Sequence, residues 1–316
     1  MGQTPDIVTA AEALKAGRLV AFPTETVYGL GADACSDTAV AAIFAAKGRP
    51  EFNPLIMHVG SLEEARRFGT FSPTALKLAE AFWPGPLTLV VARSPDCPVS
   101  LLATAGLDSI ALRVPAHPIG RALLSAFGGP VAAPSANLSG RLSPTLADHV
   151  RDQLGDKVAV IVEGGPTDVG LESTIVSCLT DPPSHLRAGG VAREEIEQAL
   201  GAALAGGEME DGKPISPGQL QHHYAPRAAL RLNAESAEPG EAVLAFGPNV
   251  PAHDGLVLNL SPRGDLQEAA ANLFAYLHEL DASADRIAAM PVPDTGLGEA
   301  INDRLRRAAA PRTLDV

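Results

Sequence analysis

Hydrophobic and polar positions alternate in two ways along the first two hundred residues. Short apolar runs are followed by amphipathic stretches, which is the pattern of an α/β domain. The apolar runs predict strands at residues 19–23, 55–59, 87–92, 110–114, 131–133, 158–162 and 174–178. The amphipathic stretches predict helices over residues 7–16, 37–47, 61–68 and 73–82.

Local chemistry marks several of these helix ends. Ser36 is a candidate N-cap for the helix over 37–47, and Gly48 stops that helix. The segment 61–64 reads Ser-Leu-Glu-Glu, a capping box that predicts a helix start. Pro73 suits the first turn of the next helix.

The pattern of hydrophobic residues changes at residue 205. Residues 205–228 lack apolar periodicity and predict a linker between a domain over 1–204 and a smaller one over 229–316. In the second domain, strands are expected at 242–246 and 256–260, and helices at 266–280 and 299–309. Residues 207–213 match the opening of a phosphate-binding P-loop, but Pro214 replaces its Ser or Thr and three carboxylates would repel phosphate.

The amino-acid composition and net charge argue against some classes of function. The net charge of −13 over 316 residues opposes general nucleic-acid binding, which depends on Lys and Arg neutralising phosphates. The three cysteines are widely spaced, which favours a reducing compartment. No basic and apolar leader and no apolar run of about 20 residues is visible, so a cytoplasmic protein without a membrane span is expected.

Cationic and hydroxyl side chains gather at predicted strand and helix ends. Lys47 and Arg49 follow a helix end, and a strand of period two places Ser109, Ala111 and Arg113 on one face. Arg187 and the loops 22–31, 133–140 and 170–174 add a cation, hydroxyls and amides. Each segment alone has an ordinary explanation as a turn, a cap or a solvated edge. Together they indicate a site for a triphosphate.

These segments carry a family resemblance. The stretches PTETVYGLG (23–31), KGRP (47–50), ALRVP (111–115), PSANLSG (134–140), EST (172–174) and HYAP (223–226) resemble the long, two-domain YrdC-type threonylcarbamoyl-AMP synthases. The resemblance implies an open, twisted, mixed α/β sheet with a large concave cavity, followed by a smaller Rossmann-like β/α domain. It also implies that the linker around Tyr224 lies across the cavity as a lid.

The resemblance implies a reaction of L-threonine, bicarbonate or CO2, and ATP that yields threonylcarbamoyl-AMP and pyrophosphate. The product would pass to a tRNA threonylcarbamoyl-transfer complex, without tight binding of tRNA to this chain. Magnesium would accompany ATP, and Lys47 and Arg49 would act on its phosphates. Attack on a phosphate requires positioning and charge neutralisation more than a catalytic acid or base, which suits these residue types.

The resemblance also assigns substrate contacts. Threonine would be held by Thr26, His58, Arg113, Ser135 and Ser173, with Arg113 on its carboxylate. ATP would be held by Lys47, Arg49, Asn53, Ser109, Asn137, Thr145, Arg187 and Tyr224. No protein ligand to a metal is expected.

Two other functions stay open at this point. One is an RNA-binding module with a concave basic face, which the net charge and an aromatic content of 4% disfavour. The other is a related enzyme that transfers a carbamoyl group to a different acceptor. Such enzymes carry zinc-finger-like Cys motifs, and this sequence has none.

Overall fold

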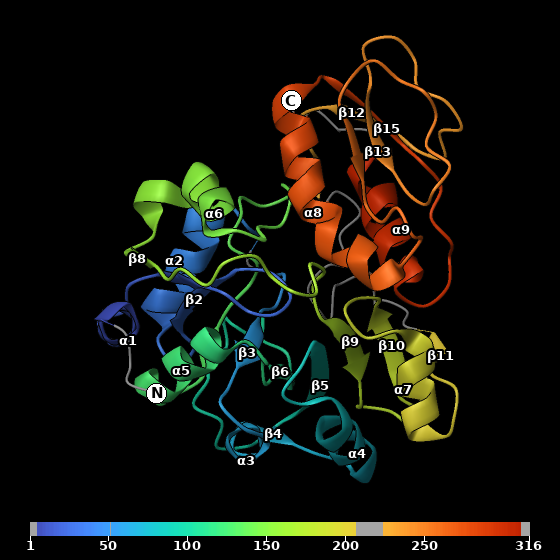
Figure 1. Cartoon of the computed structure of the whole chain (residues 1–316). Coiled ribbons are helices and arrows are strands. Elements are labelled where there is room, and N and C mark those ends of the chain that lie inside the picture. Colours follow the sequence, from blue (N-terminus) through green and yellow to red (C-terminus); the bar gives the residue numbers. More distant parts are fainter. Residues whose placement is uncertain (1–4, 51, 207–223, 311–316) are drawn as a thin grey trace.

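The protein consists of two units, each built on one β-sheet (Figure 1). The structure, a computed structural model, describes residues 5–50, 52–206 and 224–310. The larger unit lies in the lower part of Figure 1, and the smaller unit lies above it on the right. No helix in the described ranges is long and apolar enough to cross a membrane.

The larger sheet is mixed and open. Its strands pair in the order β11-β10-β9-β5-β6-β3-β7-β2-β1-β8, and β4 pairs with β5 beside this path. The strands are β1 (Val20–Phe22), β2 (Gly29–Asp33), β3 (Ile56–His58), β4 (Gly69–Thr70), β5 (Leu87–Arg93), β6 (Ser109–Arg113), β7 (Val131–Ala132), β8 (Val160–Ile161), β9 (Thr174–Ser177), β10 (Ser184–Arg187) and β11 (Ala205–Gly206). This confirms the predicted α/β class and mixed sheet.

The helices of the larger unit pack against two parts of this sheet. They are α1 (Pro5–Lys15), α2 (Asp37–Lys47), α3 (Leu62–Ala65), α4 (Pro73–Phe82), α5 (Pro118–Phe127), α6 (Ala147–Leu154) and α7 (Arg193–Leu200), with a 3-10 turn at Gly155–Lys157. Side chains of α2, α4, α6 and α7 share one core with alternate residues of the strands. Those of α1 and α5 share another with β1 and β7.

Alternation along the central strands leaves part of one sheet face for a site. On β3 and β6, Met57 and Leu112 point into the main core. Their neighbours Ile56 and Ala111 belong to a small separate cluster with Val90 and Ile175. Because side chains alternate between faces, His58 and Arg113 lie on the same side as this small cluster.

Local signals set the helix ends. The Oγ of Ser36 accepts from Ala39 N, and Gly48 ends α2 with φ of 61°, while Arg49 N donates to Phe44 O at 3.0 Å. These ends were predicted. The helix at Ser61 was predicted to reach residue 68 but ends at Ala65.

The predicted loop after Pro23 is partly wrong, because Gly29–Asp33 forms β2 between β1 and β7. The two glycines of this strand disguise it in the sequence. A Cβ on Gly31 would come within 2.9 Å of both Phe22 and Val131. Glycine therefore allows close strand packing at this position rather than a turn.

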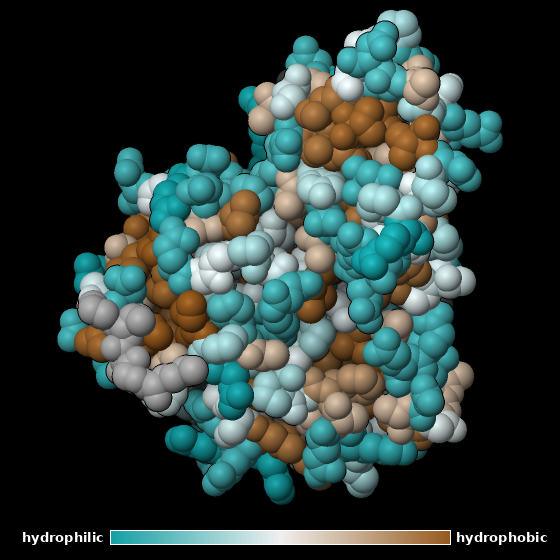
Figure 2. Space-filling model, in the orientation of Figure 1, coloured by the Kyte–Doolittle hydropathy of each residue, from teal (hydrophilic) through white to brown (hydrophobic). Residues whose placement is uncertain are grey.

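The smaller unit has four parallel strands in the order β12-β15-β13-β14. Its elements are β12 (Ala229–Arg231), β13 (Ala242–Ala245), β14 (Val257–Asn259), α8 (Leu266–Ser283), β15 (Arg286–Ala289) and α9 (Leu297–Ala308). Strands β12 and β15 were not predicted. Apolar side chains also gather on the outer surface of this unit (Figure 2).

The two units share apolar packing. The core of the smaller unit includes Val27, Leu142 and Leu171 of the larger unit. Residues Ala205 and Gly206, which the sequence places in the linker, pair with β10. The P-loop-like stretch and His223 of the HYAP motif fall at positions 207–223, outside the described residues.

Candidate active site

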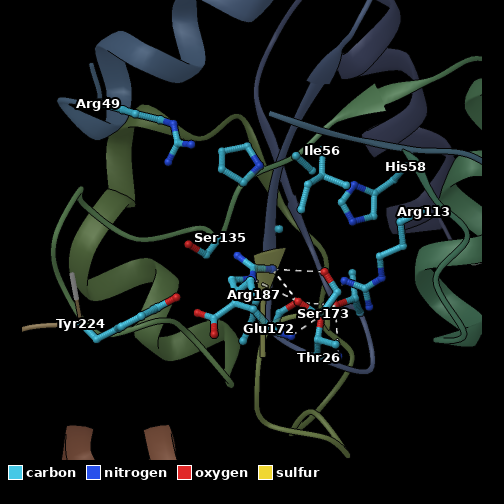
Figure 3. Close-up of a pocket in the computed structure, with 15 residues that line it drawn as sticks. Thr26, Arg49, Ile56, His58, Arg113, Ser135, Glu172, Ser173, Arg187 and Tyr224 are labelled. Atoms are coloured by element: carbon cyan, nitrogen blue, oxygen red, sulfur yellow. Dashed lines mark hydrogen bonds between the residues drawn. The ribbon is translucent and has the colours of Figure 1, made fainter. Parts of the chain in front are cut away.

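A cavity opens on the sheet face left free by the helices, beside the smaller unit (Figure 3). Its lining comes from segments far apart in the chain: Thr24, Thr26, Val27, Gly29, Arg49, Ile56, His58, Arg113, Ala133, Pro134, Ser135, Glu172, Ser173, Arg187 and Tyr224. His58 and Arg113 lie on one side of this close-up, and Arg49 and Tyr224 on the other. Ser135, Ser173 and Arg187 lie between them.

The strands β3 and β6 place His58 and Arg113 side by side. They are parallel neighbours, and His58 is directly opposite Arg113 in the register. His58 is buried, and its Nδ1 has no hydrogen-bond partner among the described residues. Burial, together with the nearby charge of Arg113, lowers the pKa of His58 to about 3, so the ring is neutral at pH 7.

Arg113 is held by a buried carboxylate. Its Nη2 lies 2.6 Å from Glu25 Oε1, its Nη1 donates to Thr26 Oγ1 at 2.9 Å, and its Nε donates to Gly85 O at 3.2 Å. Burial alone would raise the pKa of Glu25, but the charge and hydrogen bond of Arg113 outweigh burial and lower it. The guanidinium therefore lies in a fixed orientation at the cavity wall.

Arg49 is buried without such a carboxylate. Its Nε donates to Asn53 O at 3.3 Å and its Nη2 to Pro54 O at 3.0 Å, and no described carboxylate lies within ion-pair distance. Burial, with the nearby charge of Arg187, lowers the pKa of Arg49 to about 10. Arg49 therefore remains charged at pH 7, in a position that favours an anion.

Lys47 lies behind this part of the cavity. Its Nζ donates to Ser135 O at 2.6 Å and to Asn137 O at 2.5 Å, and Asn137 Oδ1 is 3.4 Å away. Burial, with the charge of Arg49, lowers the pKa of Lys47 well below its ordinary value. Lys47 thus fixes the loop that carries Ser135.

Ser173 and Arg187 form the floor between the two sides. Arg187 donates from Nε and Nη2 to Ser173 O, at 3.1 and 2.8 Å, and from Nη2 to Ser173 Oγ at 3.2 Å. Ser173 Oγ also lies 2.7 Å from Thr88 Oγ1. Strands β9 and β10 are antiparallel neighbours, which places the two residues at one end of the sheet.

Most of the residues named from the sequence reach the cavity, but some do not. Lining positions are taken by Thr26, Arg49, His58, Arg113, Ser135, Ser173, Arg187 and Tyr224. The cavity lining does not include Lys47, Asn53, Ser109, Asn137 and Thr145. Ser109 pairs with Ala92 at the opposite end of β6 from Arg113, roughly 13 Å along the strand.

The side chain of Asn137 supports its own loop. Its Nδ2 donates to Leu138 O and Arg141 O, so the amide closes the turn over 137–141. Asn53 Oδ1 and Thr145 Oγ1 are buried and have no hydrogen-bond partner among the described residues. Contacts of these residues with ATP stay predictions.

Sequence reasoning missed two carboxylates of the site. Glu172 lines the cavity, and Glu25 holds Arg113 from behind. Both belong to motifs that had been singled out, PTETVYGLG and EST. The roles of both carboxylates depend on arginines distant in the chain. Burial of a charged residue would have marked them, but burial is not visible in the sequence.

Known protein families match nearly the whole chain. The family described as telomere recombination, which groups Sua5, YciO and YrdC proteins, matches residues 12–189. The threonylcarbamoyl-AMP synthase C-terminal domain matches residues 191–310. The threonylcarbamoyl-AMP synthase of Bacillus subtilis is 42% identical, over 98% of this chain and 94% of that protein.

Solved structures extend the comparison to the fold. The crystal structure of Pyrococcus abyssi Sua5 complexed with L-threonine matches with a TM-score of 0.87 and 40% identity, over 96% of this chain and 94% of that chain. Escherichia coli YciO matches with a TM-score of 0.54 and 25% identity, over 58% of this chain and 88% of that chain. The resemblance read from the motifs is thereby confirmed. The chain belongs to the threonylcarbamoyl-AMP synthase family, in the form that joins a YrdC-like unit to a second, C-terminal unit.

Proposed function

We propose that this protein makes threonylcarbamoyl-AMP and pyrophosphate from L-threonine, bicarbonate or CO2, and ATP. One observation carries the proposal: a single cavity joins a side with His58 and Arg113 to a side with Arg49, a buried cation that has no carboxylate partner among the described residues. An amino acid and a triphosphate could therefore meet there. Family membership supports the same reaction.

Threonine is proposed to bind between Arg113 and the hydroxyls around it. A guanidinium donates five N–H bonds, and three of those of Arg113 are accounted for by Gly85, Thr26 and Glu25. The remaining donors suit a carboxylate. The hydroxyls of Thr26, Ser135 and Ser173 and the neutral ring of His58 would hold the amino and hydroxyl groups of threonine.

ATP is proposed to place its phosphates beside Arg49 and Arg187. Both side chains are buried and both line the cavity. Tyr224 closes this side, with a φ of 66° that is unusual for a residue other than glycine. Lys47 would add positive charge from behind, and Asn53, Asn137, Thr145 and Ser109 are retained as proposed ATP contacts from the family resemblance.

The proposed reaction requires two anions to approach each other. The amine of threonine would add to CO2 with loss of a proton, or to bicarbonate with loss of water, to give N-carboxy-threonine. Its carboxylate oxygen would then attack the α-phosphate and displace pyrophosphate. Fixed cations reduce the repulsion in this step and need no reorganisation during it. Arg49 and Arg187 would neutralise the phosphates, while Arg113 holds the attacking molecule in line.

Magnesium is proposed to enter with ATP. The two carboxylates at the cavity are already engaged, Glu25 with Arg113 and Glu172 with Arg304 of α9, so neither fits the part of a metal ligand. Triphosphate oxygens are themselves suitable ligands for magnesium, and the ion would supply further charge neutralisation. We further propose that the protein works in the cytoplasm and passes its product to a tRNA-modifying transfer complex.

The test is pyrophosphate release from ATP by the purified chain, with single omissions. We expect release that requires both threonine and bicarbonate, and a product with the mass of threonylcarbamoyl-AMP. Release that does not depend on threonine would contradict the proposal. Salt-sensitive, tight binding of tRNA in the absence of ATP would instead favour an RNA-binding role.

A further inference from the structure

Arg304 of α9 reaches from the smaller unit to the wall of the active site. The residue is fully buried, with 0% of its side chain exposed. Its Nε donates to Glu172 Oε2 at 3.0 Å, and its Nη1 donates to Ala188 O at 2.9 Å. In Figure 1, α9 lies directly above β9 and β10, from whose ends these contacts come.

These two contacts flank two residues of the site. Glu172 precedes Ser173, and Ala188 follows Arg187. Ser173 and Arg187 are themselves joined by three hydrogen bonds across β9 and β10. The guanidinium of Arg304 therefore links the same two segments as the Ser173–Arg187 bonds do, through the neighbouring residues Glu172 and Ala188.

Tyr224, which lines the cavity, is also in contact with Arg304. The guanidinium carbon of Arg304 lies 5.2 Å from the centre of the Tyr224 ring, within the range of a cation–π contact. Phe274 of α8 also lies beside this ring, at 5.5 Å between ring centroids. Two helices of the smaller unit thus hold the side chain that closes the ATP side.

The backbone around Glu172 has little room to move. A Cβ on Gly170 would lie 2.4 Å from Ala270 O of α8, and one on Gly189 would lie 2.3 Å from Glu172 O. The second oxygen of Glu172, Oε1, accepts from Ser143 Oγ at 2.5 Å. The carboxylate is therefore fixed from both sides, and Arg304 supplies a contact from the smaller unit.

We propose that Arg304 is a positioning residue for the active site, which holds Ser173, Arg187 and Tyr224 in place through Glu172, Ala188 and the tyrosine ring. Arg304 does not line the cavity, so its effect is transmitted through these contacts. The smaller unit would accordingly be part of the catalytic machinery. The proposal rests on the proposed function for its substrates, threonine and ATP.

The test compares Arg304→Met and Arg304→Lys with Arg306→Met in the full chain. Arg306 lies two residues away on the same helix and is exposed, so it is the matched control. We measure the threonine and ATP dependence of pyrophosphate release, and binding of each substrate by calorimetry below the unfolding temperature of every variant. Arg304→Met should raise the threonine concentration for half-maximal rate by about tenfold to a hundredfold, since small displacements near reacting groups have effects of this size.

Arg304→Lys should show an intermediate effect, because an ammonium can remain beside Glu172 without also reaching Ala188 and stacking on Tyr224. The double variant Glu172→Gln/Arg304→Met distinguishes a positioning role of Arg304 from a role limited to neutralising the charge of Glu172. It also removes the charge of Glu172, which Arg304→Met deprives of its arginine, so it should regain thermal stability, but threonine affinity should stay low.

Recovery of wild-type threonine affinity in this double variant would overturn the proposal, as would wild-type substrate dependence in Arg304→Met. Failure of the wild-type chain and Arg306→Met to release pyrophosphate would instead contradict the proposed function. In that case, calorimetry would still compare the affinities of the Arg304 variants for threonine and ATP.

Discussion

Four of the buried basic residues in and around the cavity fall into two groups that differ in their partners. Arg113 and Arg304 are each paired with a buried carboxylate, at 2.6 and 3.0 Å. Lys47 and Arg49 donate instead to neutral oxygens, and within the described part of the chain neither forms an ion pair with a carboxylate.

This difference predicts opposite effects on stability when the residues are replaced. A buried ion pair that loses one partner leaves an uncompensated charge, so the paired arginines contribute to folding. An unpaired buried cation opposes folding unless a ligand supplies the missing charge. We infer that the fold retains Arg49 for an anionic ligand, which in the proposed function is the triphosphate of ATP.

The largest expected effect follows from breaking a pair. Arg113→Met should lower the free energy of unfolding by about 3–5 kcal/mol, because Glu25 remains buried without its partner. It should also raise the threonine requirement for pyrophosphate release. Urea denaturation and initial rates would measure the two effects. Adding Glu25→Gln should recover part of the stability, and an unchanged stability in the single variant would contradict the assignment of this pair.

Removing Arg49 should have the opposite pair of effects: a slower reaction without a loss of stability. Arg49→Met should reduce the rate of pyrophosphate release by about a hundredfold to a thousandfold, the loss typical of a group that stabilises transition-state charge. The free energy of unfolding should stay equal or rise, because a buried charge has been removed. Arg18→Met, at an exposed position after α1, is the control. A less stable Arg49→Met with normal rates would reverse the comparison.

Ligand binding should stabilise the wild-type chain through the same cations. At an ATP concentration one hundred times its Kd, the free energy of unfolding should rise by about 2.7 kcal/mol. Thermal denaturation with and without ATP measures this shift. It should be much smaller in Arg49→Met and close to normal in Arg18→Met. An equal shift in both variants would show that Arg49 does not contact ATP.

The smallest effect concerns two histidines at the contact between the units. The rings of His149 on α6 and His278 on α8 are stacked, with centroids 3.8 Å apart. Burial, with the charge of His278, lowers the pKa of His149 to about 3 from 6.5. The unfolded chain therefore takes up the proton first as pH falls below 6.5, and stability decreases from there toward pH 3.

His149→Phe should keep the stacked arrangement and flatten this slope. Because His149 is only half-buried and partly screened by solvent, we expect a difference of about 0.5 kcal/mol between pH 7.5 and pH 6. Chemical denaturation at several pH values would measure it. Parallel stability curves for the two proteins would contradict this role of His149.

Glu25 should act at lower pH. Its pKa in the folded protein lies below the ordinary value of 4.5, so its stabilising contribution is complete above 4.5 and is lost as pH falls through the folded value. Acid denaturation of the wild type should therefore be steeper in this range than that of Glu25→Gln. A similar acid transition in both would contradict the paired state of Glu25.

Local features of the fold could be read from the sequence, whereas distant contacts could not. Ser36 and Gly48 predicted both ends of α2, because capping depends on neighbours a few residues away. The pairing of Arg113 with Glu25 spans 88 residues, and that of Arg304 with Glu172 spans 132. Neither has a local signal. Similarly, the glycines of β2 suggested a loop because the side chains that crowd them come from β1 and β7.

The residues of the site also divide into those that local motifs predict and those that depend on their position in the fold. The motif residues Thr26, Arg49, His58 and Arg113 line one cavity, and their contacts with substrates stay predictions. Ser109 was grouped with Arg113 because both lie on one face of a strand. A shared face does not bring two residues together, because four residues along a strand separate Ser109 from Arg113 by roughly 13 Å.

The most direct test of the central claim is a crossed calorimetric titration of two variants with both substrates. Arg49→Met should bind ATP at least tenfold more weakly and threonine normally, while Arg113→Met, titrated below its unfolding temperature, should bind threonine more weakly and ATP normally. That result would support a cavity divided between Arg49 for phosphate and Arg113 for threonine. Loss of threonine binding with normal ATP binding in Arg49→Met would contradict it.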